Sequence, residues 1–170
     1  GVDVDVDGGP ATGSDEVVVN GTTGQDTITY APAPSGSGAT DEASVVVGSL
    51  GTITLTTTEQ VVIDGLGGDD TVVVDGDDDD QEGFEVTPGA ALDAGTVSIT
   101  NVDQGVTLLG FQFQGLGIGG DLLIDGDGDP AEELVVNGTA NRDEFEVLDG
   151  DADTTVDDVR LETAAGTFVD

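Results

Sequence analysis

The sequence contains the stretch Glu59-Gln-Val-Val-Ile-Asp-Gly-Leu-Gly-Gly-Asp-Asp-Thr-Val-Val-Val74, which aligns without gaps with residues 15–30 and again with residues 132–147. One aspartate occupies the same position in all three copies, as Asp26, Asp70 and Asp143. These aspartates are 44 and 73 residues apart (70 − 26 and 143 − 70). The two separations divide into two and three units of roughly 22 to 24 residues, a period typical of repeat proteins that stack short units.

Each copy is expected to form two short strands separated by a Gly/Asp turn. Apolar and polar residues alternate on both sides of the turn, which indicates strands with one face in a core. Glycine, at 28 of 170 residues, supplies the tight corners. The sequence therefore predicts an all-β fold, a parallel β-helix or β-roll-like solenoid of about seven short coils. The expected inward pairs are Ile28/Tyr30, Ile53/Leu55, Val72/Val74, Phe84/Val86, Val97/Ile99, Phe111/Phe113, Leu122/Ile124, Leu134/Val136 and Phe145/Val147.

The length of the chain fits one module that spans residues 1–170. A Pro- and Ser-rich stretch near residues 31–43 is expected to be a loop inserted into one coil. Because solenoid ends expose unpaired strand edges, we expect the chain to be a fragment or repeat of a larger surface protein.

The composition excludes several classes of function. Asp and Glu total 37 against two basic residues, Arg142 and Arg160, so the formal net charge is −35. Nucleic acids and anionic membranes require basic patches and are poor partners. The chain has no His, Cys or Lys, which removes thiolate, imidazole and amine catalysis, and we expect no enzymatic activity. Carboxylates and hydroxyls remain, and these groups bind hard cations such as Ca²⁺.

The turn Gly65-Leu-Gly-Gly-Asp-Asp-Thr-Val-Val73 resembles the Gly-Gly-x-Gly-x-Asp-x-hydrophobic-x nonapeptide of RTX-type β-roll proteins. The resemblance implies a secreted, calcium-binding solenoid, in which Gly65 and Gly68 form the corner and Asp70 is a ligand. It implies Asp26 and Asp143 as the equivalent ligands in the other copies, and Asp69, next to Asp70, is a further candidate ligand. The alternative is a plain solenoid whose turn aspartates accept hydrogen bonds from the backbone.

A second group of acidic clusters follows other strands. The loop Asp125-Gly-Asp-Gly-Asp129 can aim several oxygens at one ion, and it is the best single candidate for a calcium site. It also resembles the calcium loop of FG-GAP propeller blades, although Leu123 and Ala131 stand where that pattern has aspartates. The alternative for all these clusters is a solvated acidic surface. The candidate ligands in the clusters are Asp125, Asp127, Asp129, Asp149, Asp151 and Asp153.

Two N-glycosylation sequons, Asn20-Gly-Thr22 and Asn137-Gly-Thr139, occupy equivalent positions in the repeats. Because Asn-Gly is also a preferred turn pair, the sequence favours the structural interpretation.

These features predict a non-catalytic structural or adhesive module at the cell surface or outside the cell. We expect calcium or high salt to stabilise it by relieving repulsion between carboxylates. Its expected partners are calcium ions, neighbouring modules or further copies of itself, and glycans or cell-surface proteins. An FG-GAP-like calcium-binding propeller fragment is the alternative, and a β-helix enzyme that acts on polysaccharides through paired aspartates is a weaker one.

Overall fold

The computed structural model describes residues 1–10, 14–33, 39–77, 80–91, 93–126 and 133–138, and the backbone of one further strand at 158–161. This part of the chain is all-β and contains no helix, which confirms the predicted all-β class. The predicted residues Phe145 and Val147 lie outside it, as do Asp127, Asp129, Asp143, Asp149, Asp151 and Asp153.

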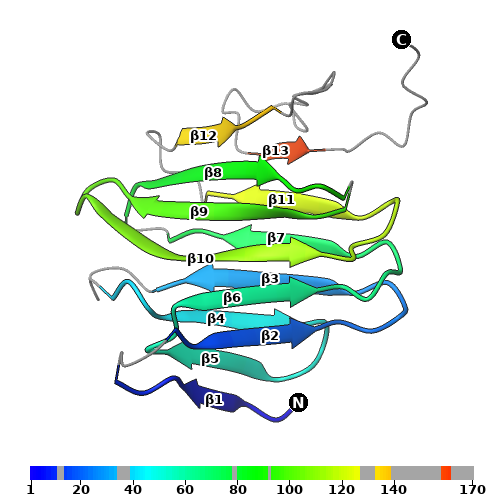
Figure 1. Ribbon diagram of the computed structural model, residues 1–170, viewed down its shortest axis with the longest axis horizontal. Coiled ribbons are helices and arrows are strands. Elements are labelled where there is room, and N and C mark those ends of the chain that lie inside the picture. The colour runs from blue at the N-terminus through cyan, green and yellow to red at the C-terminus, as the bar shows by residue number, and fades with distance from the viewer. Residues whose placement is uncertain are drawn as a thin grey trace.

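The strands form two sheets that lie one behind the other (Figure 1). Within the described residues, sheet A has seven strands and sheet B has six. In spatial order, sheet A consists of β1 (Val4–Asp7), β5 (Thr52–Thr56), β4 (Ala43–Val47), β3 (Thr27–Pro32), β7 (Thr71–Asp75), β11 (Asp121–Asp125) and β13 (Asp158–Leu161). Sheet B consists of β12 (Glu133–Val136), β8 (Glu82–Pro88), β9 (Gly95–Asn101), β10 (Val106–Gln114), β6 (Gln60–Asp64) and β2 (Glu16–Asn20).

The chain passes repeatedly from one sheet to the other. β2 leads into β3, β6 into β7 and β10 into β11. Counterparts in successive passages pair in parallel, β2 with β6 and β6 with β10 in sheet B, and β3 with β7 and β7 with β11 in sheet A. Between the passages lie two antiparallel meanders, β3-β4-β5 in sheet A and β8-β9-β10 in sheet B. Both sheets are therefore mixed, whereas the sequence predicted parallel stacking alone. These large mixed sheets do not support the propeller alternative, whose blades are small antiparallel sheets.

The repeat in space is about twice as long as the sequence predicted. Glu16 pairs with Gln60, 44 residues further on (60 − 16), and Thr71 pairs with Asp121, 50 residues further on (121 − 71). The extra residues belong to the meanders. Residues 48–51, for example, form the turn between the antiparallel strands β4 and β5. The stretch predicted as an inserted loop contains the end of β3 and the connection, residues 33–42, to its antiparallel partner β4.

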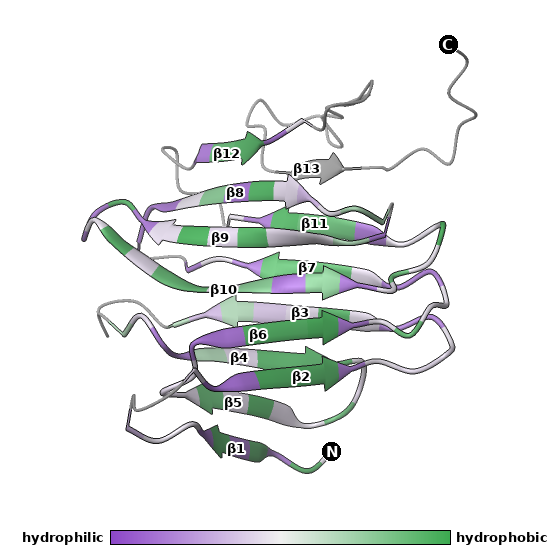
Figure 2. Ribbon diagram, viewed as in Figure 1, coloured by the Kyte–Doolittle hydropathy of each residue, from purple (hydrophilic) through white to green (hydrophobic). Residues whose placement is uncertain are grey.

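The core lies between the sheets and is built from the predicted inward residues. Ile28, Tyr30, Val72 and Val74 have no exposed surface, and the outward residues between them are partly exposed. Figure 2 shows hydrophobic residues along the strands and hydrophilic residues at many of their ends. Ile53 and Leu134 are only partly buried, because each lies near one end of the stack of strands. The other predicted inward residues that are buried are Leu55, Phe84, Val86, Val97, Ile99, Phe111, Phe113, Leu122 and Ile124.

One buried hydrogen bond joins the two sheets through the core. The hydroxyl of Tyr30 in β3 donates to the carbonyl oxygen of Leu109 in β10 at 2.5 Å. The register of β10 against β9 shifts between Leu108 and Phe111, so this segment is a bulge. A bulge leaves a residue out of the regular ladder, which explains why the Leu109 carbonyl can accept from a side chain. The Tyr30 ring also lies against Phe111, with ring centroids 4.5 Å apart.

Candidate functional site

Three corners stack at the side of the molecule where sheet B leads into sheet A (Figure 1). Corner 1 (residues 21–26) joins β2 to β3, corner 2 (65–70) joins β6 to β7, and corner 3 (115–120) joins β10 to β11. Backbone hydrogen bonds hold them in register, including those from the Asp70 N–H to the Leu116 carbonyl at 2.8 Å and from the Asp121 N–H to the Asp70 carbonyl at 2.9 Å. Asp26 and Asp70 therefore lie on adjacent corners, although 44 residues separate them in the sequence (70 − 26).

Glycine is required where corner 2 approaches its two neighbours. Gly68 has a φ of 134°, and a Cβ atom there would lie 2.6 Å from the carbonyl oxygen of Gly24. A Cβ atom on Gly65 would lie 2.3 Å from the Asp70 Oδ2 atom and 2.7 Å from the Gly115 carbonyl oxygen. Both glycines singled out by the nonapeptide pattern thus permit close approach of neighbouring corners.

The two adjacent aspartates of corner 2 reach in opposite directions. The Oδ1 atom of Asp70 accepts the backbone N–H of Asp26 in corner 1 at 2.8 Å. The Oδ1 atom of Asp69, which has a φ of 60°, accepts the backbone N–H of Gly119 in corner 3 at 2.9 Å. Carboxylates of corner 2 therefore accept backbone hydrogen bonds from both neighbouring corners. This is the role that the plain-solenoid alternative gave to turn aspartates.

The equivalent aspartates Asp26 and Asp70 differ in how their second oxygen is satisfied. The Oδ2 atom of Asp26 accepts the N–H of Thr22 at 2.6 Å and its hydroxyl at 2.7 Å. Leu66 occupies the position of Thr22 in corner 2 and has no hydroxyl, and its N–H donates to the Oδ1 atom of Asp64 at 3.0 Å. The Oδ2 atom of Asp70 is buried and has no hydrogen-bond partner.

Burial sets the electrostatics of Asp70. The residue has no exposed surface, and this desolvation is the main reason why its pKa is raised above the ordinary value. The N–H of Asp26 opposes the rise, and the carboxylates of Asp26 and Asp69 add to it. A buried anionic oxygen without a partner is unfavourable, so a proton or a cation at the Oδ2 atom would stabilise this corner.

Asp70 is the described candidate that best fits a cation, but its surroundings offer an incomplete set of ligands. Ca²⁺ takes roughly six to eight oxygen ligands. The described residues include no group of three or more acidic side chains placed to hold one ion. The free Oδ2 atom of Asp70 and the nearby Gly115 carbonyl are the oxygens that converge over Gly65.

Asp125, from the other predicted loop, is the last residue of β11 and is half-buried. It lies directly opposite Asp75 of β7 in the parallel register. Its own carbonyl oxygen accepts the N–H of Gly76 at 2.8 Å. Its predicted fellow ligands Asp127 and Asp129 are outside the described residues, so that predicted site stays a prediction.

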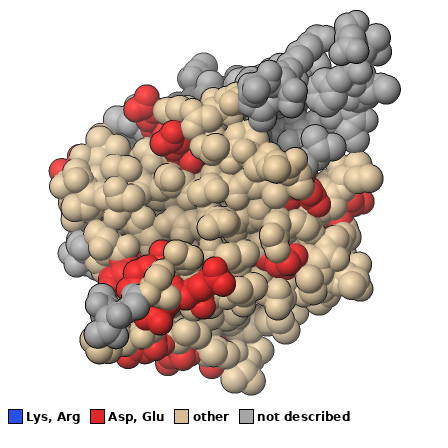
Figure 3. All heavy atoms as spheres, in the orientation of Figure 1, with Lys and Arg blue, Asp and Glu red and all other residues tan. Residues whose placement is uncertain are grey.

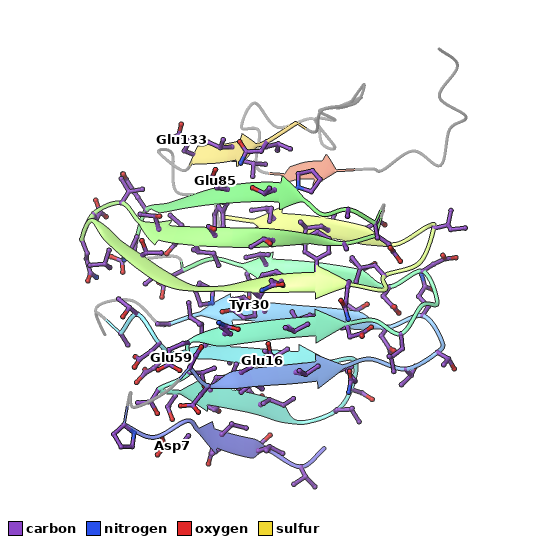
Figure 4. The ribbon with its side chains drawn as sticks, viewed as in Figure 1. Asp7, Glu16, Tyr30, Glu59, Glu85 and Glu133 are labelled. Carbon is purple, nitrogen blue, oxygen red and sulfur yellow. The ribbon has the colours of Figure 1, made fainter. Side chains whose placement is uncertain are left out.

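Carboxylates also accept backbone hydrogen bonds at the opposite side of the molecule, where β1 leads into β2 and β5 into β6. The Oε2 atom of Glu59 accepts the N–H of Asp15 at 2.8 Å. The Oδ1 atom of Asp7 accepts the Thr57 hydroxyl and the Gly9 N–H (Figure 4). The Thr57 hydroxyl, and then the Gly9 N–H, hold the pKa of the exposed Asp7 carboxyl below its ordinary value.

Several of these roles have no signal in the sequence. Thr22, Leu66 and Asp64 decide which aspartate keeps a free oxygen, yet none of them belongs to the fixed positions of the nonapeptide. One signal could have placed corner 3 beside corner 2. Both corners begin with Gly-Leu-Gly, at residues 65–67 and 115–117.

Comparisons with known proteins identify no relative. No family model matches the chain, and neither a curated protein nor a solved structure is similar to it at a significant level. The described residues also include no helix that is long and apolar enough to cross a membrane.

Proposed function

We propose that the chain is a non-catalytic, extracellular structural or adhesive module, a solenoid-type stack that calcium or high salt stabilises. The observation that supports this proposal most directly is the set of carboxylates that reach from one corner to the next. Asp70 holds corner 1 and Asp69 holds corner 3, and both do so through backbone N–H groups. The described acidic groups thus serve to join successive passages of the chain.

The charge distribution supports a dependence on cations. Both arginines lie beyond residue 138, so the described residues up to that point contain no basic side chain that could neutralise a carboxylate. On the face in Figure 3, acidic residues gather towards the margins, and much of the middle is uncharged. Repulsion between these carboxylates is long-ranged at low ionic strength. In molar salt the screening length is only about 3 Å, so the repulsion is weak. Dissolved cations would therefore favour the folded stack.

Asp70 is the described residue at which a bound cation would act most directly. Its buried Oδ2 atom has no donor, so a cation would satisfy this oxygen as the two Thr22 donors satisfy the Oδ2 atom of Asp26 in corner 1. A ligand that binds only the folded state stabilises that state by mass action. The loop at Asp125, Asp127 and Asp129 remains the proposed second place for calcium on the basis of its sequence.

The ends of the sheets support the assembly role in this proposal. Sheet A ends at β1 and sheet B at β2, so two strand edges lie free at the same end of the described stack. Free edges can pair with a neighbouring module or a further copy of the chain. A spacer or adhesive module would use such contacts in place of catalysis.

Far-ultraviolet circular dichroism during a calcium titration tests the proposal, with a parallel NaCl series at matched ionic strength. We expect a β-sheet spectrum to develop as cations are added, at millimolar or lower calcium if specific sites dominate and only in molar NaCl if screening dominates. A chain that remains unfolded at every cation concentration would refute the proposal. So would a stability that does not change between cation-free buffer and either salt.

A further inference from the structure

An Asn-Gly-Thr sequon begins at each edge of sheet B. β2 forms one edge and ends at Asn20, and β12 forms the opposite edge and is followed by Asn137. The backbones of both asparagines are held by the neighbouring inner strand, Asn20 in register with Asp64 and Asn137 through an N–H bond to the Val86 carbonyl at 2.9 Å. Thr139 lies outside the described residues, and the hydroxyl of Thr22 donates to Asp26, so the comparison is confined to the side chains of the two asparagines.

The amide of Asn137 is engaged by the neighbouring strand. Its Nδ2 atom donates to the Oε1 atom of Glu85 at 2.7 Å and to the hydroxyl of Thr87 at 2.9 Å. Glu85 and Thr87 both lie on the exposed face of β8. The side chain of Asn137 is therefore held on this strand, and both protons of its amide nitrogen are in use.

The amide of Asn20 is exposed and makes no hydrogen bond within the described part of the chain. The neighbouring strand β6 explains the difference. Val62 of β6 stands where β8 has Glu85, and it offers no acceptor. The carboxylate of Asp64, directly opposite Asn20, is already occupied by the Leu66 N–H and by the amide of Gln114 at 2.7 Å.

We propose that Asn20 is an N-glycosylation site and that Asn137 in the folded protein is not. The assignment rests on the proposed extracellular function, because sequons are modified in proteins that are exported. In the reaction, an oligosaccharyltransferase uses an oligosaccharide linked to a lipid phosphate or pyrophosphate. A bond forms between the Nδ2 atom of Asn20 and the anomeric carbon of the sugar, and the bond from that carbon to the phosphate oxygen breaks. The phosphate leaves with the bonding electrons, and one amide proton is released.

A glycan at Asn20 would cover an edge strand that has little other protection. The other free edge at this end, β1, carries Asp5 and Asp7, and charges of this kind discourage unwanted strand pairing. β2 has one acidic residue, Glu16, and its Val18 side chain is 50% exposed on the same face as Asn20. The bulky, hydrated sugar would shield Val18 and hinder strand pairing at β2, so assembly through this end of the stack would be left to β1, whose carboxylates dissolved cations can screen.

Transfer to the folded, purified full chain tests the assignment. The reaction contains a single-subunit oligosaccharyltransferase that requires only the three-residue sequon, with a lipid-linked oligosaccharide as donor. Circular dichroism in the same buffer records whether the chain is folded, and mass spectrometry of peptides gives occupancy at each site. The unfolded chain is the matched control, since both sites then present the same tripeptide. The two hydrogen bonds of Asn137, one of them to a charged group, predict that the initial rate at Asn20 exceeds that at Asn137 by about tenfold or more.

A double variant, Glu85→Ala with Thr87→Ala, tests the cause of the difference. Removing both acceptors should raise the rate at Asn137 towards that at Asn20 and leave Asn20 unchanged. Equal rates in a chain with a β-sheet spectrum would overturn the assignment, as would modification of Asn20 only after unfolding. A chain that shows no β-sheet spectrum in any salt would overturn the proposed function and, with it, the geometric basis of the assignment. The first two results would leave the proposed function intact.

Discussion

Corner 1 and corner 2 share a glycine pattern and an aspartate in the same register, but they treat that aspartate differently. In corner 1, Thr22 donates twice to the Oδ2 atom of Asp26. In corner 2, Leu66 takes the place of Thr22, and the Oδ2 atom of Asp70 is buried without a donor. A repeated motif therefore does not guarantee a repeated site, because a residue outside the motif decides whether a carboxylate oxygen stays free.

The largest effect on stability is expected at Gly68, which has a close backbone contact that its equivalent in corner 1, Gly24, lacks. Gly68→Ala should reduce the free energy of unfolding by about 3 kcal/mol, since it combines a strained φ with a collision against the Gly24 carbonyl. The matched control is Gly24→Ala at the equivalent position of corner 1. A Cβ atom there would meet nothing closer than the Thr22 Oγ1 atom at 3.7 Å, so a change within about 0.5 kcal/mol is expected. Chemical denaturation of both variants measures the difference, and equal losses would contradict the close contact between the two corners.

A smaller effect, of opposite sign in the two corners, is expected from neutralising the equivalent aspartates. Without calcium at neutral pH, Asp70→Asn should raise the free energy of unfolding by about 1–3 kcal/mol, because it removes a buried charge that lacks a partner. Asp26→Asn should lower it by about 1–2 kcal/mol, because the two Thr22 donors lose a charged acceptor, and hydrogen bonds to a neutral amide oxygen are weaker.

The same pair of variants sharpens the cation proposal. Any calcium-dependent rise in Tm that arises at corner 2 should disappear in Asp70→Asn and persist in Asp26→Asn. Thermal unfolding with and without calcium distinguishes the two. Loss of the calcium response in Asp26→Asn alone would move the ion to corner 1 and contradict the comparison.

The smallest effect is expected from pH, and it also has opposite signs at two sites. The pKa of Asp70 is raised above 3.8 in the folded state, so folding takes up a proton between 3.8 and the raised value, and this group adds stability as pH falls through that interval. The pKa of Asp7 is lowered, so its contribution is present above 3.8 and is lost as pH falls through the lowered value. Denaturant unfolding in calcium-free buffer between about pH 2 and pH 6 tests both signs.

The expected pattern appears in the difference between each variant and the parent chain. Asp7→Asn should lower stability above pH 4, and the difference from the parent chain should shrink towards the acid end of the range, as the Asp7 carboxyl becomes protonated in the folded state as well. The Asp70→Asn variant should not show the rise in the free energy of unfolding that protonation of Asp70 gives the parent chain on mild acidification. A difference that is independent of pH for both variants would mean that neither hydrogen bonding nor burial controls these carboxyl groups.

Much of the fold could be predicted because strand alternation is visible in the sequence. Ile28 and Tyr30, or Val72 and Val74, follow a period of two that leaves little choice about which side faces the core. Alternation does not encode strand direction, however. The antiparallel strands β4 and β9 carry the same pattern as the parallel ones, so the sequence did not reveal the meanders or the spacing of 44 to 50 residues between parallel partners.

The candidate site could be predicted less completely. The nonapeptide pattern located Asp70 and its glycines, which the structure brings together in corner 2. Its neighbours come from corners 44 and 50 residues away in the parallel register, and only that register shows that Asp69 and Asp70 hold different corners. Whether a carboxylate oxygen has a hydrogen-bond partner depends on individual donors such as the Thr22 hydroxyl. The spacing of residues in the nonapeptide pattern does not predict these donors.

The bond between Tyr30 and Leu109 gives the protein a built-in optical reporter. Tyr30 is the sole tyrosine, and the chain has no tryptophan, so near-ultraviolet absorbance and emission come chiefly from one ring at the centre of the core. Burial raises the pKa of its phenol, which opposes ionisation while the two sheets stay together. In alkaline solution, the absorbance of the phenolate would therefore record the separation of the sheets without any attached dye.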